Sequence, residues 1–94
     1  MSTDLARARV RRRSDVVAVE LDGRVVVFHE PTGRVRSFNP TGSMLWRVLD
    51  GTSTVGELAD AIAEELGVEP SVARADVRSF VAGLIRYRFA ERVD

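Results

Sequence analysis

Cysteine is absent from the 94-residue chain, and histidine occurs only once, as His29. Without cysteine the chain can form no disulfide scaffold, thiolate metal site or cysteine nucleophile. A single histidine cannot build a metal site without further ligands. No serine stands in a GxSxG context, and no glycine-rich loop resembles a phosphate-binding or dinucleotide-binding fingerprint. The sequence therefore predicts a protein that is not an enzyme and that holds no metal and no cofactor.

Lysine, net charge and long apolar runs are also missing. All 14 basic residues are arginine, and 14 acidic residues balance them. A neutral chain offers no global attraction to nucleic acid or to an anionic membrane. No apolar run reaches the roughly 18 residues that a membrane span needs, and the first residues lack the apolar segment of a signal peptide. We expect a cytoplasmic protein with no membrane partner, and we do not expect nucleic acid as its ligand.

The length and composition fit one small soluble domain, with 45 % apolar and 30 % charged residues. Residues 1–14 are polar and rich in arginine, which predicts a flexible N-terminal arm. Such an arm is most often solvated, and contact with an anion or a nucleic acid is the alternative. Residues 15–94 are predicted to form the folded domain.

Residues 16–38 have the pattern of a three-stranded antiparallel meander. Asp22-Gly23 and Pro31-Thr32-Gly33 are turn signals, and each separates runs rich in β-branched residues. The second run, residues 25–28, is apolar on both faces and suits the middle strand. The third run, residues 34–38, is short and carries arginine at alternate positions. Because it offers few apolar side chains to bury, we expect it to be an edge strand.

Three helices are predicted after the meander. Asn39 is a suitable N-cap for the first, with Pro40 at its first position, and Asp50-Gly51 ends it. Thr54 and Glu57 have the spacing of a capping box that starts the second, and Gly67 stops it. The third helix is predicted from Pro70 to about Arg88. Its predicted core stripe consists of Val77, Phe80, Val81 and Leu84.

The sequence therefore predicts an α+β fold, in which a three-stranded antiparallel sheet packs on a three-helix, winged-helix-like bundle. Winged helices serve both as DNA readers and as protein-interaction modules, and the fold alone does not decide between these uses. Arginines in the third helix, such as Arg74 and Arg78, keep a DNA-binding regulator open as the alternative.

A series of short motifs resembles the PqqD-like family, and their order and spacing carry the resemblance more than any single motif. The motifs in the first half are Asp22-Gly-x-Val-Val, Thr32-Gly-Arg, Phe38-Asn39-Pro40-Thr41-Gly42, Trp46, Leu49-Asp50-Gly51 and Thr54-Val55-x-Glu57-Leu58. The later motif is Ala75-Asp76-Val77-x-x-Phe80-Val81-x-x-Leu84. Members of this family are recognition elements for the precursors of ribosomally made, post-translationally modified peptides.

The resemblance implies that the chain binds the leader of a precursor peptide as a strand added beside the third strand and against the third helix. It also implies that the chain presents this peptide to a leader peptidase or to a radical SAM maturation enzyme. An open strand edge suits such β-augmentation. The expected peptide-binding residues are Arg34, Val35, Arg36, Ser37, Phe38, Arg74, Arg78, Val81 and Ile85. Arg34 and Arg36 favour a leader with acidic residues. An interaction module that binds no leader is a further alternative.

Overall fold

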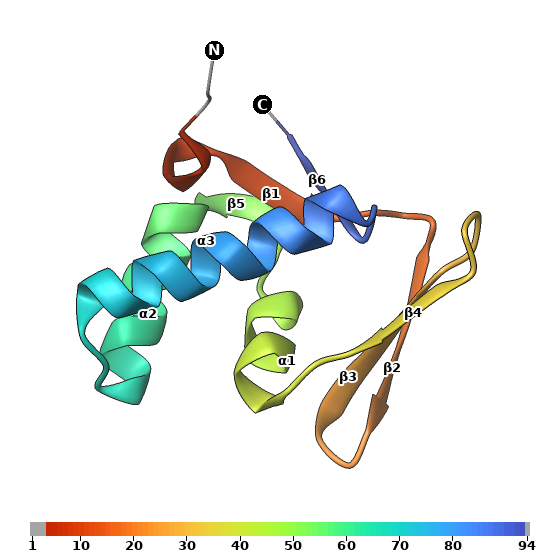
Figure 1. Cartoon of the computed structure of the whole chain (residues 1–94), viewed down its shortest axis with the longest axis horizontal. Coiled ribbons are helices and arrows are strands. Elements are labelled where there is room, and N and C mark those ends of the chain that lie inside the picture. Colours follow the sequence, from red (N-terminus) through yellow and green to blue (C-terminus); the bar gives the residue numbers. More distant parts are fainter. Residues whose placement is uncertain (1–3, 94) are drawn as a thin grey trace.

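The computed structural model describes residues 4–93. These residues form three α-helices, one short 3-10 helix and two three-stranded antiparallel sheets (Figure 1). In chain order the elements are η1 (Leu5–Arg7), β1 (Arg9–Arg12), β2 (Val16–Leu21), β3 (Arg24–His29), β4 (Arg34–Ser37), α1 (Pro40–Arg47), β5 (Asp50–Thr54), α2 (Val55–Leu66), α3 (Pro70–Arg86) and β6 (Ala90–Arg92). The α+β class and the three helices are as predicted, whereas the second sheet is not.

The first sheet is the predicted meander, in the order β2-β3-β4. Asp22 and Gly23 form its first turn with φ angles of 54° and 77°. Positive φ at both positions is the geometry of a two-residue hairpin, which explains the Asp-Gly pair. Val25 and Val27 of β3 are buried against the helices. The arginine-rich β4 lies at an edge of the sheet, as its polar sequence predicts.

The second sheet, β5-β1-β6, corrects the expectation of a flexible arm over residues 1–14. β1 is its central strand, and the side chains of Ala8 and Val10 are buried in the core. The alternation of these small apolar residues with arginines is the pattern of a half-buried strand, which the density of arginine concealed. Residues 1–3, the first part of the expected arm, lie outside the described residues.

The helix starts agree closely with the predicted caps. The Asn39 side chain accepts a hydrogen bond from the Gly42 N–H at 2.7 Å, and Pro40 follows it in the first turn of α1. Thr54 and Glu57 form the reciprocal capping box of α2. α1 ends earlier than expected, because residues from Asp50 onward form β5. α3 ends at Arg86, two residues before its predicted end.

The two sheets lie at different places on the helical layer (Figure 1). The second sheet packs beside α2 and the C-terminal end of α3, while the first sheet extends away from the helices. The molecule is thin, with an extent of 19 Å along its shortest axis against 37 and 34 Å along the others. In the first sheet, Val25, Val27 and His29 of β3 are buried toward the helices, while the opposite face of the sheet is not covered.

Candidate functional site: a groove between β4 and α3

The outward edge of β4 carries unpaired backbone groups. Phe38 donates its N–H to the Val25 carbonyl at 3.0 Å, and β4 pairs with β3 from Arg34 to Ser37. Hydrogen-bonded pairs alternate along an antiparallel ladder, so Arg34 and Arg36 direct their backbone groups to β3. Val35 and Ser37 then direct theirs outward. No strand among residues 4–93 pairs with this edge.

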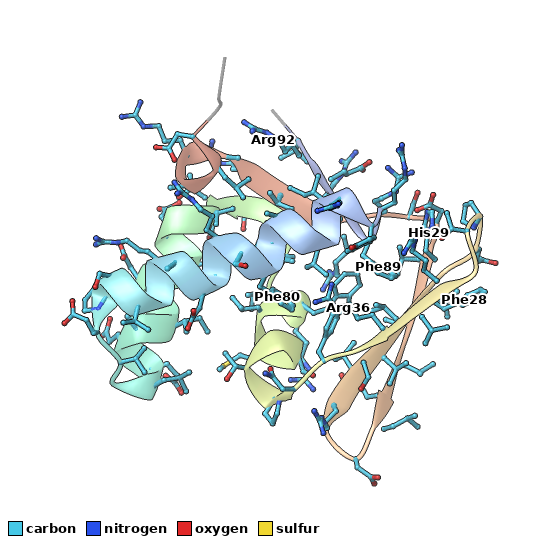
Figure 2. All side chains as sticks on the ribbon, in the orientation of Figure 1. Phe28, His29, Arg36, Phe80, Phe89 and Arg92 are labelled. Atoms are coloured by element: carbon cyan, nitrogen blue, oxygen red, sulfur yellow. The ribbon has the colours of Figure 1, made fainter. Side chains whose placement is uncertain are left out.

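α3 presents a ridge of four residues to this edge, namely Asp76, Phe80, Gly83 and Tyr87. Residues three and four positions apart share a helix face, so these four lie in one row. A Cβ placed on Gly83 would lie 3.5 Å from the Arg36 Nη1 atom. The Arg34 guanidinium carbon lies 4.7 Å from the centre of the Tyr87 ring. Figure 2 shows Arg36 between β4 and α3. We call the space between β4 and this row the β4–α3 groove.

The groove opens into a hollow at each end. At the start of β4, a hollow of about 210 Å³ is lined by Arg34, Val35, Arg36, Tyr87 and Phe89. Near the start of α1, a larger hollow of about 440 Å³ lies between the three α-helices. Leu45, Leu66, Val72, Val77 and Phe80 are among its lining residues, and Asp76 adds one carboxylate. The groove therefore combines arginine at one end with apolar surface at the other.

Phe38 forms the floor under the middle of the groove. Its ring lies 5.2 Å from the Phe80 ring in an edge-to-face arrangement and 5.8 Å from the Trp46 ring. Because Phe38 is only 3 % exposed, its side chain cannot contact a ligand directly. It was expected as a peptide contact, and the structure shows instead that it supports Phe80 from below.

Gly42 allows the close approach of α1 to this aromatic cluster. A Cβ at Gly42 would lie 3.0 Å from Phe80 Cε1 and 3.2 Å from Phe38 Cβ. Contacts this short between carbon atoms lie inside the usual van der Waals separation of 3.5–4.0 Å. A glycine in the first turn of α1 thus keeps Phe80 at the wall of the groove.

The four residues expected from α3 lie elsewhere, which corrects the predicted helix face. Val81 is fully buried in the core. Arg74 meets Asp60 of α2 at 3.3 Å, and Arg78 meets Asp4 at 3.3 Å, so both lie on the flank of α3 that faces away from β4. Ile85 follows Arg78 by two helical turns, so it shares that flank, and it is partly buried against the core.

The sequence did not reveal which flank of α3 faces β4. Both flanks border the same apolar stripe, so helical spacing alone treats them alike. The N-terminal segment determines which flank of α3 remains open, because η1 and Asp4 cover the Arg78 flank. A usable signal was present on the other flank, where Gly83 stands between Phe80 and Tyr87. A glycine inside a helix often marks a close approach.

A polar cluster around the buried His29 fixes the turn that precedes β4. His29 is 1 % exposed, and its Nδ1 lies 2.7 Å from Thr32 Oγ1 while its Nε2 lies 3.2 Å from Asp15 Oδ2. Arg13 makes a bidentate pair with Asp15 at 2.9 Å. The hydrogen bond from Arg13, with a second from His29, lowers the pKa of Asp15 to about 2 despite partial desolvation. The cluster joins the two sheets and positions the turn, so its role is structural.

Neither a metal site nor a membrane segment is present in the described part of the chain. Residues 4–93 contain no group of three potential metal-ligating side chains. None of their helices is long and apolar enough to cross a membrane. The groove is therefore the main candidate for a ligand site, and its open backbone edge suits an extended peptide.

Comparisons with known proteins agree with this geometry. A family model described as coenzyme PQQ synthesis protein D (PqqD) matches residues 24–90. No curated protein matches the chain.

Three solved structures share the fold. TbiB1, in complex with the TbiA(beta) leader peptide, is 28 % identical and superposes with a TM-score of 0.78, covering 86 % of this chain and 94 % of its own. A lasso peptide synthetase B1 complexed with the leader peptide is 21 % identical, with a TM-score of 0.79 and coverage of 89 % and 99 %. The PqqD truncation of Methylobacterium extorquens PqqCD, a stand-alone recognition element, is 21 % identical, with a TM-score of 0.71 and coverage of 88 % for both chains.

Proposed function

The chain belongs to the PqqD family, and from this premise we propose that it binds the leader of a ribosomally made precursor peptide as a strand added to β4. The family resemblance read from the sequence motifs is confirmed by the match over residues 24–90. The open edge of β4 beside the α3 ridge is the observation that carries the proposal. TbiB1, which is similar to this chain, is itself bound to a leader peptide.

Side chains of the added strand point alternately into the groove and away from the helices, and this alternation determines which leader residues the groove can recognise. Leader residues that hydrogen-bond with Val35 and Ser37 direct their side chains away from the helices, as those two residues do. Leader residues opposite Arg34 and Arg36 direct theirs into the groove. Acidic side chains suit the guanidinium groups there, because arginine pairs well with carboxylates. Apolar side chains suit the hollow near Phe80.

The proposed activity is recognition without chemistry, carried out in the cytoplasm. We assign no catalytic step to the chain, and the partner that acts on the bound precursor is a leader peptidase or a radical SAM maturation enzyme. A DNA-reading role is not favoured. Of the arginines considered for it, Arg74, Arg78, Arg86 and Arg88, the first two meet carboxylates of the same chain and Arg88 lies beyond the end of α3.

Two proline variants test the proposed edge. Ser37→Pro removes an outward N–H from β4, and Ala18→Pro is the matched control because Ala18 has an outward N–H on the other edge strand, β2. Proline is tolerated on edge strands where its missing donor faces solvent, so both variants are expected to fold. Circular dichroism checks this.

The readout is the fluorescence anisotropy of a labelled leader peptide, taken from a short precursor reading frame to be sought beside the gene of this chain. Ser37→Pro should weaken leader binding by about tenfold, because a main-chain hydrogen bond to the added strand is lost. Ala18→Pro should bind like the unaltered chain. Equal affinities in all three proteins, or binding of duplex DNA in preference to the leader, would refute the proposal.

A further inference from the structure

The face of the first sheet that points away from the helices is made almost entirely of apolar side chains. Register pairs place residues of neighbouring strands on one face, as with Val19 and Val26, and with Phe28 and Val35. We call this surface the outer face, and it consists of Val17, Val19, Leu21, Val26, Phe28 and Val35. Only Arg24 and Ser37, at the end near the first hairpin, add polar groups to it.

The outer face is exposed in the isolated chain. Val35 is 65 % exposed, Leu21 59 % and Val19 49 %. Figure 2 shows Phe28 on the side of the sheet away from α3. An antiparallel sheet with one solvated face normally alternates apolar and polar residues. Here β3 is apolar toward solvent as well as toward the core, and β2 adds Val17, Val19 and Leu21 to the solvent side, which is the mark of a surface that a partner covers.

We propose that the outer face is the docking surface for the maturation enzyme, and that the bound leader completes it. This inference rests on the proposed function. The occupant is a protein with an uncharged, apolar contact surface, because no ionisable group lies among the six residues of the outer face. An ionic partner would find only the Arg24 guanidinium, at one end of the face.

The leader completes the face because of the strand alternation at β4. An added strand extends the sheet by one row, and its residues paired with Val35 and Ser37 place their side chains on the outer side. These side chains would lie next to Val35, and apolar ones would continue the apolar surface. The enzyme would thus contact both the chain and its cargo, and would bind the loaded form more tightly than the empty one.

The size of the face favours a transient enzyme contact over a second copy of the chain. Three strands about 4.8 Å apart, with up to six residues at about 3.3 Å each, offer only a few hundred Å². A stable protein pair buries roughly 800 Å² on each partner. A symmetric dimer through this face would therefore be weak. A carrier that delivers its peptide is expected to bind the enzyme more tightly when the leader is bound.

The test compares two valines of similar exposure, Val19 in the outer face and Val48 at the end of α1, which are 49 % and 45 % exposed. Each is changed to lysine. The candidate maturation enzyme, a leader peptidase or radical SAM enzyme to be sought beside the chain's gene, is purified and immobilised. Its binding to each variant is followed by biolayer interferometry with and without the leader peptide. Leader affinity is measured separately by fluorescence anisotropy, and circular dichroism checks the fold.

The unaltered chain should bind the enzyme, and the leader should tighten this binding. Val19→Lys should weaken enzyme binding by about tenfold or more, since it buries an unpaired charge in an apolar contact. It should leave leader affinity unchanged, whereas Val48→Lys should leave both affinities unchanged. Phe28→Thr, which removes apolar area without adding charge, should weaken enzyme binding in the same direction.

Several results would overturn the proposal. If leader binding is intact and both Val19→Lys and Phe28→Thr bind the enzyme like the unaltered chain, the docking surface is wrong while the proposed function stands. If the unaltered chain does not bind the leader, the proposed function itself fails. Sedimentation equilibrium of the chain alone provides a third check. A leader-independent dimer that Val19→Lys dissociates would assign the outer face to a second copy instead.

Discussion

Arg36 lies directly across Gly83, because a side chain at that position of α3 would meet the Arg36 guanidinium, with a Cβ 3.5 Å from Nη1. This is an ordinary van der Waals separation, so a methyl group fits, and a larger side chain would have to displace the Arg36 guanidinium. The groove therefore has its width set by one glycine in the middle of an otherwise well-formed helix.

Two substitutions at Gly83 should separate stability from binding. Gly83→Ala should stabilise the chain by up to about 1 kcal/mol, because glycine is a poor residue for a helix interior. Its leader affinity should stay within about twofold of the unaltered chain. Gly83→Leu should keep the same helical preference but fill the groove, and should weaken leader binding by more than about tenfold. Urea unfolding and anisotropy measure the two effects, and strong leader binding by a well-folded Gly83→Leu would place the peptide elsewhere.

The same change, glycine to alanine, should have the opposite effect at Gly42. There a Cβ would lie 3.0 Å from Phe80, and the core must shift to admit it. We expect Gly42→Ala to destabilise the chain by about 1–2 kcal/mol, the usual cost of overpacking less the gain in helix preference. Urea unfolding is the measurement, with Gly83→Ala as the comparison. A gain in stability from Gly42→Ala would show that α1 moves freely against Phe80.

Arg36 and Arg78 lie on opposite flanks of α3, which gives a matched pair for leader binding. Arg36→Gln should reduce affinity for a leader with acidic residues by about threefold to tenfold, with a smaller loss at high salt because charge attraction is screened. Arg78→Gln removes the same charge on the flank that Asp4 occupies and should have no effect. Anisotropy titrations at two salt concentrations compare them. A larger loss of leader affinity for Arg78→Gln than for Arg36→Gln would instead support the helix face first predicted from the sequence.

Acid should destabilise the chain partly through Asp15. Its pKa falls from 3.8 to about 2 in the folded chain, mainly through the hydrogen bond from Arg13. A lowered carboxyl pKa means that the folded state favours the ionised form, so this contribution is complete above about pH 4 and is lost as the pH falls toward 2. Glu20, Asp50 and Glu57 have lowered pKa values too and act in the same direction.

The Asp15→Asn variant isolates the contribution of Asp15 to the pH dependence of stability. Urea midpoints should be lower than those of the unaltered chain near pH 6, and the two proteins should converge as the pH approaches 2. Parallel curves over this range would show that the Arg13–Asp15 pair adds nothing to stability. Since Asp15 also touches His29, which contacts Thr32 in the turn before β4, the variant should weaken leader binding slightly as well.

Local sequence signals predicted the local structure well. Asp22-Gly23 specified a hairpin, Asn39-Pro40 the start of α1, and Thr54 with Glu57 the start of α2, because each rests on hydrogen bonds within a few residues. The polar sequence of β4 correctly indicated an edge strand, since a strand with few apolar side chains has little to bury.

Features that depend on distant contacts were missed. β1 is held as the central strand by its pairing with β5 and β6, and nothing near Val10 in the sequence indicates those partners. The error at α3 follows from the same cause. With residues 1–14 taken as a free arm, no element covered the Arg74 and Arg78 flank, and that flank looked open to a ligand.

The central place of β1 has a consequence for the order in which the protein is assembled. The ion pair between Arg11 and Glu91 joins residues 80 positions apart, and β6 follows every other described element in the chain. The β2-β3-β4 meander is held by contacts between residues close in the sequence, so it can form early in synthesis. The pairing of β1 with β6 can form only after β6 has been synthesised. Both ends of the described chain lie near the β1–β6 strand pair, away from β4 (Figure 1). An affinity tag at either terminus would therefore leave the peptide edge accessible.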